Sequence, residues 1–341
     1  MLARMGRQGE IASNYDWIQS RAQVSNSCPL RLIVEHEGRT AALVFGRLIW
    51  AGHTPLWCRR VFVLGGLEGS PLIVPKSQQD TKRSADILAA AVTRIPGMCP
   101  ESKSMVQIDG WAVHIHSADK HLTETLLKLG FVPKARVTPV LALNRTKEEL
   151  WAGLDKKTRN AVRQAEKRGV EVHHSQSAES FEQYLSLKGR YYGELRERDV
   201  QSYRLALRAG LLHIVTARAD GRLLGAAAFI ITDAEVGYLG SAMDRSSQWY
   251  RPMDAIMWAA IMYGHENGQL RLNMFGADFQ EPRLRRITQF KMGFGCRLQP
   301  FTTFIGLSTR VMGRSVLPQR AGSASIRIIE RSPLVKRLSP I

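Results

Sequence analysis

The sequence has few cysteines, few acidic residues and no long apolar run, and each shortage removes a class of protein. The four cysteines lie far apart and form no C-x-x-C pair, which argues against a zinc ribbon and a disulfide scaffold. The best apolar run, residues 223–231, is far shorter than the ~18 residues of a membrane span. Residues 1–19 hold no apolar stretch resembling a signal peptide. We therefore expect a reduced, cytoplasmic protein.

The shortage of acids leaves a strongly basic chain, with 48 Lys+Arg against 30 Asp+Glu and a formal net charge of +18. Most of this charge lies in three segments, residues 156–168, 283–297 and 310–341. Such clustering favours a polyanionic partner: a nucleic acid, a nucleotide-linked substrate or an acidic membrane surface. The alternative is a basic surface that only solvates the protein.

Hydrophobic periodicity predicts alternating strands and helices over the whole chain. In the first half we expect strands at residues 30–35, 39–50, 105–108 and 112–116, helices capped by Ser84 and Asp119, and an extended segment at 131–143. In the second half, a capping-box pattern at 146–149 starts a helix that continues to Gly169. Beyond it we expect four helices: one at 181–195, one ending at Gly210, one from Pro252 to Gly268 and one ending before Gly293. We also expect strands at 212–217, 222–231, 236–243, 270–275 and 297–305.

The two halves share a weak internal repeat. Residues 33–45 and 214–229 both read as a strand, a Gly-Arg turn and a second strand, and each half ends its last helix with Gly-Phe before a strand. Any hairpin with such a turn has the first of these patterns, so a chance likeness is the alternative. We expect an α/β (α+β) protein with related units at residues 1–143 and 144–308, followed by a basic tail or helix at 309–341.

Three segments of the second half carry a resemblance to a known family. Residues 150–170 combine Leu-Trp, Lys-Lys-Thr-Arg-Asn and Lys-Arg-Gly-Val, residues 238–252 hold Tyr-Leu-Gly-Ser-Ala and then Tyr-Arg-Pro, and residues 290–295 read Phe-Lys-Met-Gly-Phe-Gly. In this order they resemble the FemAB-type branch of the GNAT acyltransferases. The resemblance implies two tandem GNAT-like units, each a mixed, mostly antiparallel sheet flanked by helices.

The resemblance also implies an enzyme that transfers an acyl or aminoacyl group to an amine. The best-known members of this branch use aminoacyl-tRNA to build peptidoglycan side branches in the cell wall. No cofactor is firmly implied: the donor substrate is aminoacyl-tRNA or acyl-CoA. The expected acceptor is an amine-bearing envelope precursor, and peripheral contact with the inner face of an anionic membrane fits the basic C-terminal stretch.

Lys291 is the main candidate catalytic residue. It stands between Phe290 and Phe294 in the third motif, and a fixed cation near a carbonyl oxygen stabilises the negative charge that develops there during acyl transfer. The alternative is a surface lysine beside core phenylalanines. Asp254 and Asp278 are weak candidates for a general base, because helix-dipole and turn-capping roles explain them equally well.

Basic and aromatic side chains supply the candidates for substrate binding. Arg159, Arg163 and Lys156 form a stripe suited to phosphate, or else a solvated helix face. Arg251 precedes a helix N-terminus, where anions bind, and Tyr238 and Tyr250 are candidate pocket walls or core tyrosines. Phe290 and Phe294 are further candidates for binding the substrate or donor. The turn at residues 245–254 lacks the glycines that cradle the CoA pyrophosphate, and Pro252 has no N–H, which favours a tRNA-linked donor.

Three functions therefore remain open. An aminoacyl-tRNA-dependent transferase is favoured, and a CoA-dependent N-acetyltransferase of polysaccharides or small molecules is the first alternative. The second is a non-catalytic RNA- or membrane-binding protein on an acyltransferase scaffold. No metal site is expected, since the histidines lack cysteine or carboxylate partners at ligand spacing.

Overall fold

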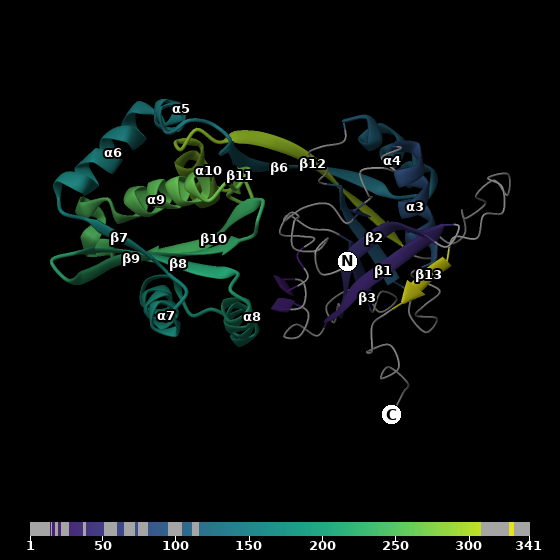
Figure 1. The fold of residues 1–341 in the computed structure, drawn as a ribbon, viewed down its shortest axis with the longest axis horizontal. Helices are drawn as coiled ribbons and strands as arrows, with labels where there is room; N and C mark the ends of the chain where they lie inside the picture. The colour runs from purple at the N-terminus through teal and green to yellow at the C-terminus, as the bar shows by residue number, and fades with distance from the viewer. Residues whose placement is uncertain are drawn as a thin grey trace. The chain divides into compact units, whose positions relative to one another are not determined.

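The protein divides into two compact units, each built from two stretches of chain. The structure, a computed structural model, describes residue 14, residues 16–17, 20–21, 27–36, 39–50, 60–64, 72–73, 81–94, 104–110, 116–307 and 327–330. One unit comprises Met1–Ser20 and Val137–Pro300, and the other comprises Arg21–Arg136 and Phe301–Ile341. The sequence analysis assigned contiguous ranges, whereas strands β6 (Val132–Ala142) and β12 (Arg297–Leu307) carry the chain between the units (Figure 1).

The unit with Val137–Pro300 is built on a mixed sheet in the order β6-β11-β10-β9-β8-β7. Its strands after β6 are β7 (Glu171–Ser175), β8 (Leu212–Ala219), β9 (Arg222–Ile231), β10 (Glu235–Met243) and β11 (Arg271–Asn273). All neighbours are antiparallel except β10 and β11. The chain reaches β11 from β10 through a helix, the connection that a parallel pair requires.

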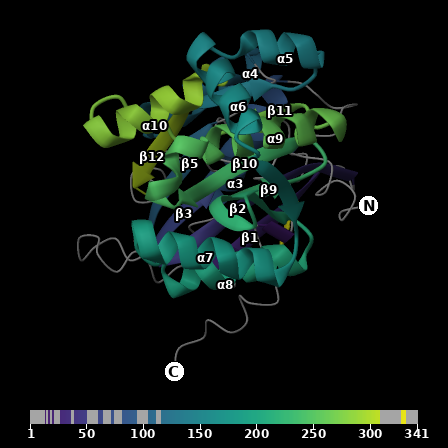
Figure 2. The ribbon, with the colours of Figure 1, turned by 90° about the vertical axis from the view of Figure 1, so that its left-hand side faces the viewer.

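Helices cover both faces of this sheet. They are α5 (Lys147–Gly153), α6 (Lys156–Lys167), α7 (Ala178–Tyr192), α8 (Glu197–Arg208), α9 (Pro252–Glu266) and α10 (Pro282–Met292). Figure 2 shows α7 and α8 on one face and α6 and α9 on the other.

Alternation along β9 explains the two layers. Ala227 and Phe229 pack in the core beneath α9, whereas Ala226, Ala228 and Ile230 pack with Phe181 and Tyr184 of α7. A strand that is apolar on both faces is buried by helices on both sides.

The other unit forms a mixed, mostly antiparallel sheet with helices beside it. Its strands are β1 (Ser27–His36), β2 (Arg39–Trp50), β3 (Arg60–Leu64), β4 (Leu72–Ile73), β5 (Ser104–Gly110) and β13 (Arg327–Glu330), and its helices are α3 (Thr81–Arg94) and α4 (His116–Lys128). Strand β1 pairs with β2 and with β13, and β3 pairs with β5 in parallel. Residues 41–44 of β2 and the apolar face of α3 are buried.

Five local predictions were wrong. Ser84 lies inside α3 and Asp119 inside α4, so neither caps its helix, and His116 belongs to α4 rather than to a strand. Residues 112–115 of that predicted strand lie outside the described residues. The helix predicted up to Gly169 is two helices, because Asp155 accepts a hydrogen bond from the Thr158 backbone and starts α6 afresh. Residues 327–330 form β13 and no helix, since they pair with β1.

The remaining strand and helix predictions of the second half are confirmed in type and order, as is the mixed α/β fold class. The capping box at Thr146 and Glu149 is formed as predicted. Among the described residues, no helix has both the length and the apolar character that a membrane crossing needs.

Candidate active site

Lys291 lies on the inward face of α10 and is 7% exposed. Its Nζ donates hydrogen bonds to the backbone carbonyl oxygens of Phe275 and Gly276, the latter at 2.8 Å. Both carbonyls belong to residues with positive φ, 42° at Phe275 and 56° at Gly276. This left-handed turn aims two consecutive oxygens at one ammonium group.

The surroundings of Lys291 make its charge costly. Burial lowers the pKa of Lys291 to about 8, and in the described part of the chain Lys291 forms no ion pair with a carboxylate. The ring centroid of Tyr238 on β10 lies 6.0 Å from Nζ. The ammonium group therefore sits in a low-dielectric position, bound to carbonyl dipoles and next to an aromatic face.

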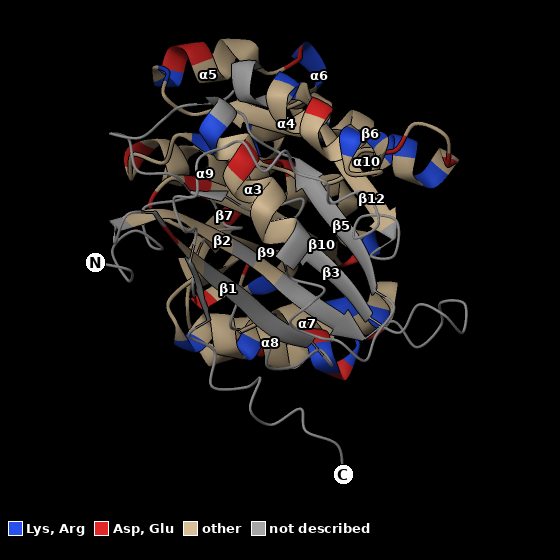
Figure 3. Cartoon of the chain, turned by 90° about the vertical axis from the view of Figure 1, so that its right-hand side faces the viewer, with Lys and Arg blue, Asp and Glu red and all other residues tan. Residues whose placement is uncertain are grey.

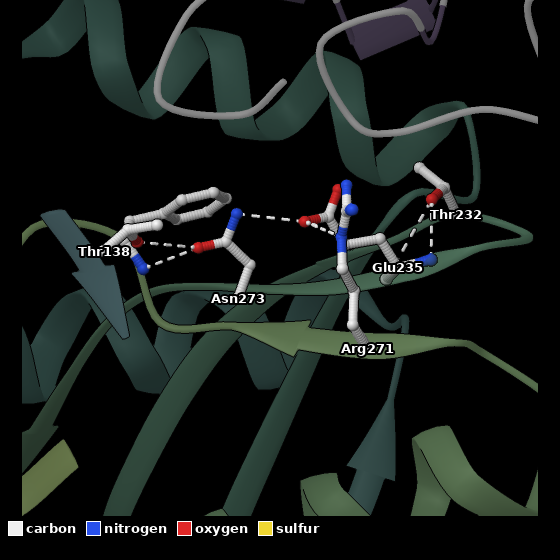
Figure 4. Close-up of polar contacts among 6 residues, drawn as sticks. Thr138, Thr232, Glu235, Arg271 and Asn273 are labelled. Atoms are coloured by element: carbon white, nitrogen blue, oxygen red, sulfur yellow. Dashed lines mark hydrogen bonds and ion pairs between the residues drawn. The ribbon is translucent and has the colours of Figure 1, made fainter. Parts of the chain in front are cut away.

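A buried polar network holds the turn that binds Lys291 (Figure 4). Glu235 of β10 is fully buried and accepts hydrogen bonds from Arg271 Nε at 3.1 Å and Asn273 Nδ2 at 2.9 Å. The Asn273 side-chain oxygen in turn accepts from Thr138 Oγ1 and from the Phe275 backbone N–H, both at 3.1 Å. Glu235 thus fixes the orientation of the Asn273 amide, and Asn273 fixes the residue whose carbonyl binds Lys291.

The two glycines after Lys291 allow the α5–α6 junction to pack against α10. The Gly293 carbonyl accepts from the Asp155 N–H at 2.9 Å, and a Cβ at Gly293 would lie 2.6 Å from Thr158 Oγ1. A Cβ at Gly295, where φ is 79°, would lie 2.7 Å from the Gly153 carbonyl oxygen. Both glycines of the motif are therefore needed for close approach.

We expect Gly295→Ala to destabilise the protein by about 3 kcal/mol, because it combines left-handed strain with a backbone clash. Gly169→Ala is the matched control: φ is 67° and nothing lies within 4 Å of the added Cβ, so about 1 kcal/mol is expected. Urea unfolding of both variants measures the difference. Equal losses would show that packing against Gly153 contributes nothing.

The other residues of the third motif and the preceding loop have structural partners. Phe294 is buried in the core, and Phe290 packs against it edge to face with ring centroids 5.2 Å apart. Asp278 Oδ1 accepts from the N–H groups of Gln280 at 2.8 Å and Glu281 at 3.1 Å, and these bonds lower the pKa of Asp278. The geometry of Asp278 is thus that of a turn cap.

Asp254 differs from Asp278 in the direction of its pKa shift. It lies in the first turn of α9, and burial raises its pKa to about 6 against the opposing charge of Arg251. Arg251 has φ of 57° and precedes Pro252, and Tyr250 ends the short 3₁₀ helix Arg245–Tyr250. No hydrogen bond or ion pair between the described side chains of Asp254 and Lys291 is formed.

The basic stripe of α6 separates into two kinds of residue. The Arg159 guanidinium donates to the carbonyls of Ala152, at 3.0 Å, and Leu154, and so closes the end of α5. Arg163 and Lys156 are exposed, with the Arg163 guanidinium 5.3 Å from the Trp151 ring centroid. Arg163 and Lys156 are therefore available to a ligand.

Comparisons with known proteins agree with this geometry. Residues 154–283 match a family model described as "Acetyltransferase (GNAT) domain". The fold is that of a GNAT acyltransferase. No curated protein matches the chain in sequence.

Solved structures extend the likeness over most of the chain. The structure of FemX is 14% identical, covers 84% of this chain and 90% of its own, and has a TM-score of 0.67. The C-terminal domain of a putative lysylphosphatidylglycerol synthetase from Agrobacterium fabrum is 11% identical, with 91% of each chain covered and a TM-score of 0.57. A tandem GNAT protein from the clavulanic acid biosynthesis pathway is 12% identical over 90% of this chain and 92% of that one, with a TM-score of 0.51. At these identities the likeness shows the fold alone, and that fold agrees with the GNAT domain that the family model matches.

Within this GNAT unit, β10 and β11 part beside Tyr238. The two strands pair only from Glu235 to Gly237 on β10, while β10 continues to Met243. A bulge between Tyr238 and Gly240 leaves Leu239 without a partner on β9. Backbone groups of an extended strand that lack a neighbour can bind an extended ligand, and here they lie beside the aromatic ring next to Lys291.

Sequence reasoning missed a second group of cations near Tyr238. Lys188 of α7 lies 3.5 Å from the Ser241 carbonyl oxygen, and the Tyr238 hydroxyl hydrogen-bonds Ser241 Oγ at 2.6 Å. The Tyr192 ring centroid lies 5.2 Å from Lys188 Nζ and 5.9 Å from the Arg245 guanidinium. The spacing of Lys188 and Tyr192, four residues apart on one helix, was the available signal.

These cations lack acidic partners. Burial and the charge of Arg283 lower the pKa of Lys188. In the described part of the chain, Lys188, Arg245 and Arg283 form no ion pair with a carboxylate. The same part of the chain holds no group of three His, Cys, Asp or Glu side chains arranged to bind a metal ion.

Proposed function

We propose that this protein transfers an aminoacyl group from aminoacyl-tRNA to the amine of an anionic cell-envelope precursor. The observation that carries the proposal is the buried ammonium group of Lys291, held by two carbonyls next to Tyr238, where the pairing of β10 with β11 ends. A cation positioned in a low-dielectric site stabilises an oxyanion far better than one in water. The match to a GNAT domain supports acyl transfer as the reaction.

The reaction assigns a role to each group. The acceptor nitrogen forms a bond to the ester carbonyl carbon, and the negative charge on the carbonyl oxygen is stabilised by Lys291. Asp254, with its pKa near 6, accepts the proton that the amine loses. The bond from the carbonyl carbon to the ribose oxygen then breaks, and that oxygen takes up a proton.

Charge and backbone geometry favour a tRNA-linked donor. The segment that precedes α9 is the 3₁₀ helix Arg245–Tyr250 followed by Arg251, and it lacks the glycine amides that cradle a pyrophosphate. The exposed cations of α6, Lys156 and Arg163, suit phosphates of a polynucleotide. Lys188, Arg245 and Arg283 suit an acceptor that carries phosphate or carboxylate groups.

A CoA-dependent N-acetyltransferase is the second candidate, favoured by the description of the matching family as acetyltransferases. The test supplies labelled aminoacyl-tRNAs or labelled acetyl-CoA together with nucleotide-linked and lipid-linked peptidoglycan precursors, and follows label into the precursor. Label from tRNA alone supports the proposal, and label from acetyl-CoA alone overturns it in favour of the second candidate. Steeply salt-dependent tRNA binding without transfer from either donor would indicate a non-catalytic binding protein.

A further inference from the structure

The loop before α10 and the first two turns of that helix expose apolar side chains. Phe279 is 45% exposed, Leu284 41% and Ile287 40%. Leu284, Ile287 and Lys291 follow the three- and four-residue spacing of one helix face. The helix face that carries Lys291 is therefore buried near the C-terminus of α10 and exposed to solvent near its N-terminus.

This exposure belongs to a well-built segment. Glu281 caps α10 by accepting from the N–H groups of Arg283 and Leu284, and Asp278 caps the turn before it. The Arg285 guanidinium donates to the Phe279 carbonyl at 2.8 Å and so ties the loop to the helix. Because its polar groups are satisfied locally, the segment presents its apolar side chains in a fixed arrangement.

Arginines surround the apolar side chains. Arg283, Arg285 and Arg286 are exposed, and none of them pairs with a carboxylate in the described part of the chain. The acids of the segment, Asp278 and Glu281, are occupied as caps. Figure 3 shows Lys and Arg along α10. The segment is thus both apolar and positively charged.

This combination distinguishes between partners. RNA phosphates would bind the arginines but would not bury the exposed leucine and isoleucine side chains. At a bilayer surface, aliphatic and aromatic side chains enter the acyl boundary while arginines bind anionic headgroups. We propose that the segment of residues 279–287, the α10 docking segment, binds the surface of an anionic membrane.

The docking segment would bring the proposed site to the membrane, because Lys291 lies one helical turn beyond Ile287. This proposal rests on the proposed function and adds to it the surface of the protein that contacts the lipid. Its test uses no donor or acceptor, so failure of vesicle binding and failure of transfer are separate results.

The experiment measures flotation of the full chain with vesicles of phosphatidylcholine alone or mixed with phosphatidylglycerol. We expect binding only to the anionic vesicles. Leu284→Asn combined with Ile287→Asn should weaken it at least tenfold, and Arg286→Gln about fivefold, as expected for one cation near a charged surface. Leu270→Asn is the matched control: Leu270 is 55% exposed but lies outside the segment, and its removal should leave binding unchanged.

Melting temperatures equal to that of the parent confirm that the variants remain folded. Equal vesicle binding by the double variant and the parent would overturn the proposal, as would an equal loss in Leu270→Asn. Loss of tRNA binding with unchanged vesicle binding in the double variant would also overturn it, in favour of an RNA interface.

Discussion

Replacing Lys291 by alanine should lower the rate constant of acyl transfer by about 10²–10³-fold, the usual cost of removing one oxyanion donor. The buried ammonium group lies 6.0 Å from the Tyr238 ring centroid, at the point where the pairing of β10 with β11 ends. Removing it leaves the developing negative charge without compensation in a position that excludes water. Single-turnover kinetics with the charged donor measures the effect on the chemical step.

The pH dependence of the transfer rate distinguishes two roles for Lys291: stabilisation of the oxyanion by its cation, and general-base catalysis by its neutral amine. With its pKa lowered to about 8, Lys291 is charged at neutral pH and loses its proton as the pH rises. If the cation stabilises the oxyanion, the rate must fall as the pH rises through about 8, and Lys291→Arg must remove this fall while retaining part of the activity. A fall in rate near pH 8 that persists unchanged in Lys291→Arg would contradict the assignment, because a guanidinium group stays charged at that pH.

Lys291 also binds two carbonyls, so loss of structure must be distinguished from loss of charge. Lys291→Met keeps most of the side-chain volume and should lose as much activity as Lys291→Ala with a smaller drop in melting temperature. Lys120→Ala, which removes an exposed lysine of α4, should change neither quantity. Full activity in both Lys291 variants would exclude the proposed role.

Local signals in the sequence were sufficient for most elements of the second half, and a continuous motif made Lys291 the main candidate, whose role stays a prediction. Each of these signals spans only a few residues of chain: the hydrophobic pattern of strands 212–217 and 222–231, the Thr146 capping box and the glycines that end helices. All of them are present in the structure. Lys291 was found because its motif is continuous. The break at Asp155 was missed because the apolar pattern of 150–165 runs through it, and only the cap shows that the helix restarts.

Contacts between distant residues explain what sequence reasoning missed. Glu235 meets Asn273 across 38 residues, and Thr138 meets Asn273 across 135. The segment of β13 pairs with β1 from the opposite end of the chain, and no local pattern in residues 327–330 indicates that partner. The hydrogen-bond partner of a polar residue inside a strand can be predicted only once the neighbouring strand is known.

Removing the Glu235 carboxylate should be among the most destabilising single changes in the protein. Glu235 and Arg271 form an ion pair at 3.1 Å with side chains 0% and 10% exposed, and breaking such a buried pair costs about 3–5 kcal/mol. Glu182 and Arg204 form a pair at the same 3.1 Å distance, but both side chains are about half exposed. We therefore expect Glu235→Ala to lose several times more stability in urea unfolding than Glu182→Ala, which should lose at most about 1 kcal/mol.

The Glu235 variants also test whether the network positions Lys291. In Glu235→Ala the Asn273 amide loses the acceptor that orients it, and the Phe275 carbonyl loses its fixed position beneath the ammonium group. Replacing both Glu235 and Arg271 by methionine should restore much of the stability, since no charge is left buried, but not the orientation of Asn273. If this double variant recovers the stability and also the parent's fall in rate near pH 8, the network serves only to stabilise the fold. A recovered stability with an altered pH profile shows that Glu235 acts on the reaction through Asn273, Phe275 and Lys291.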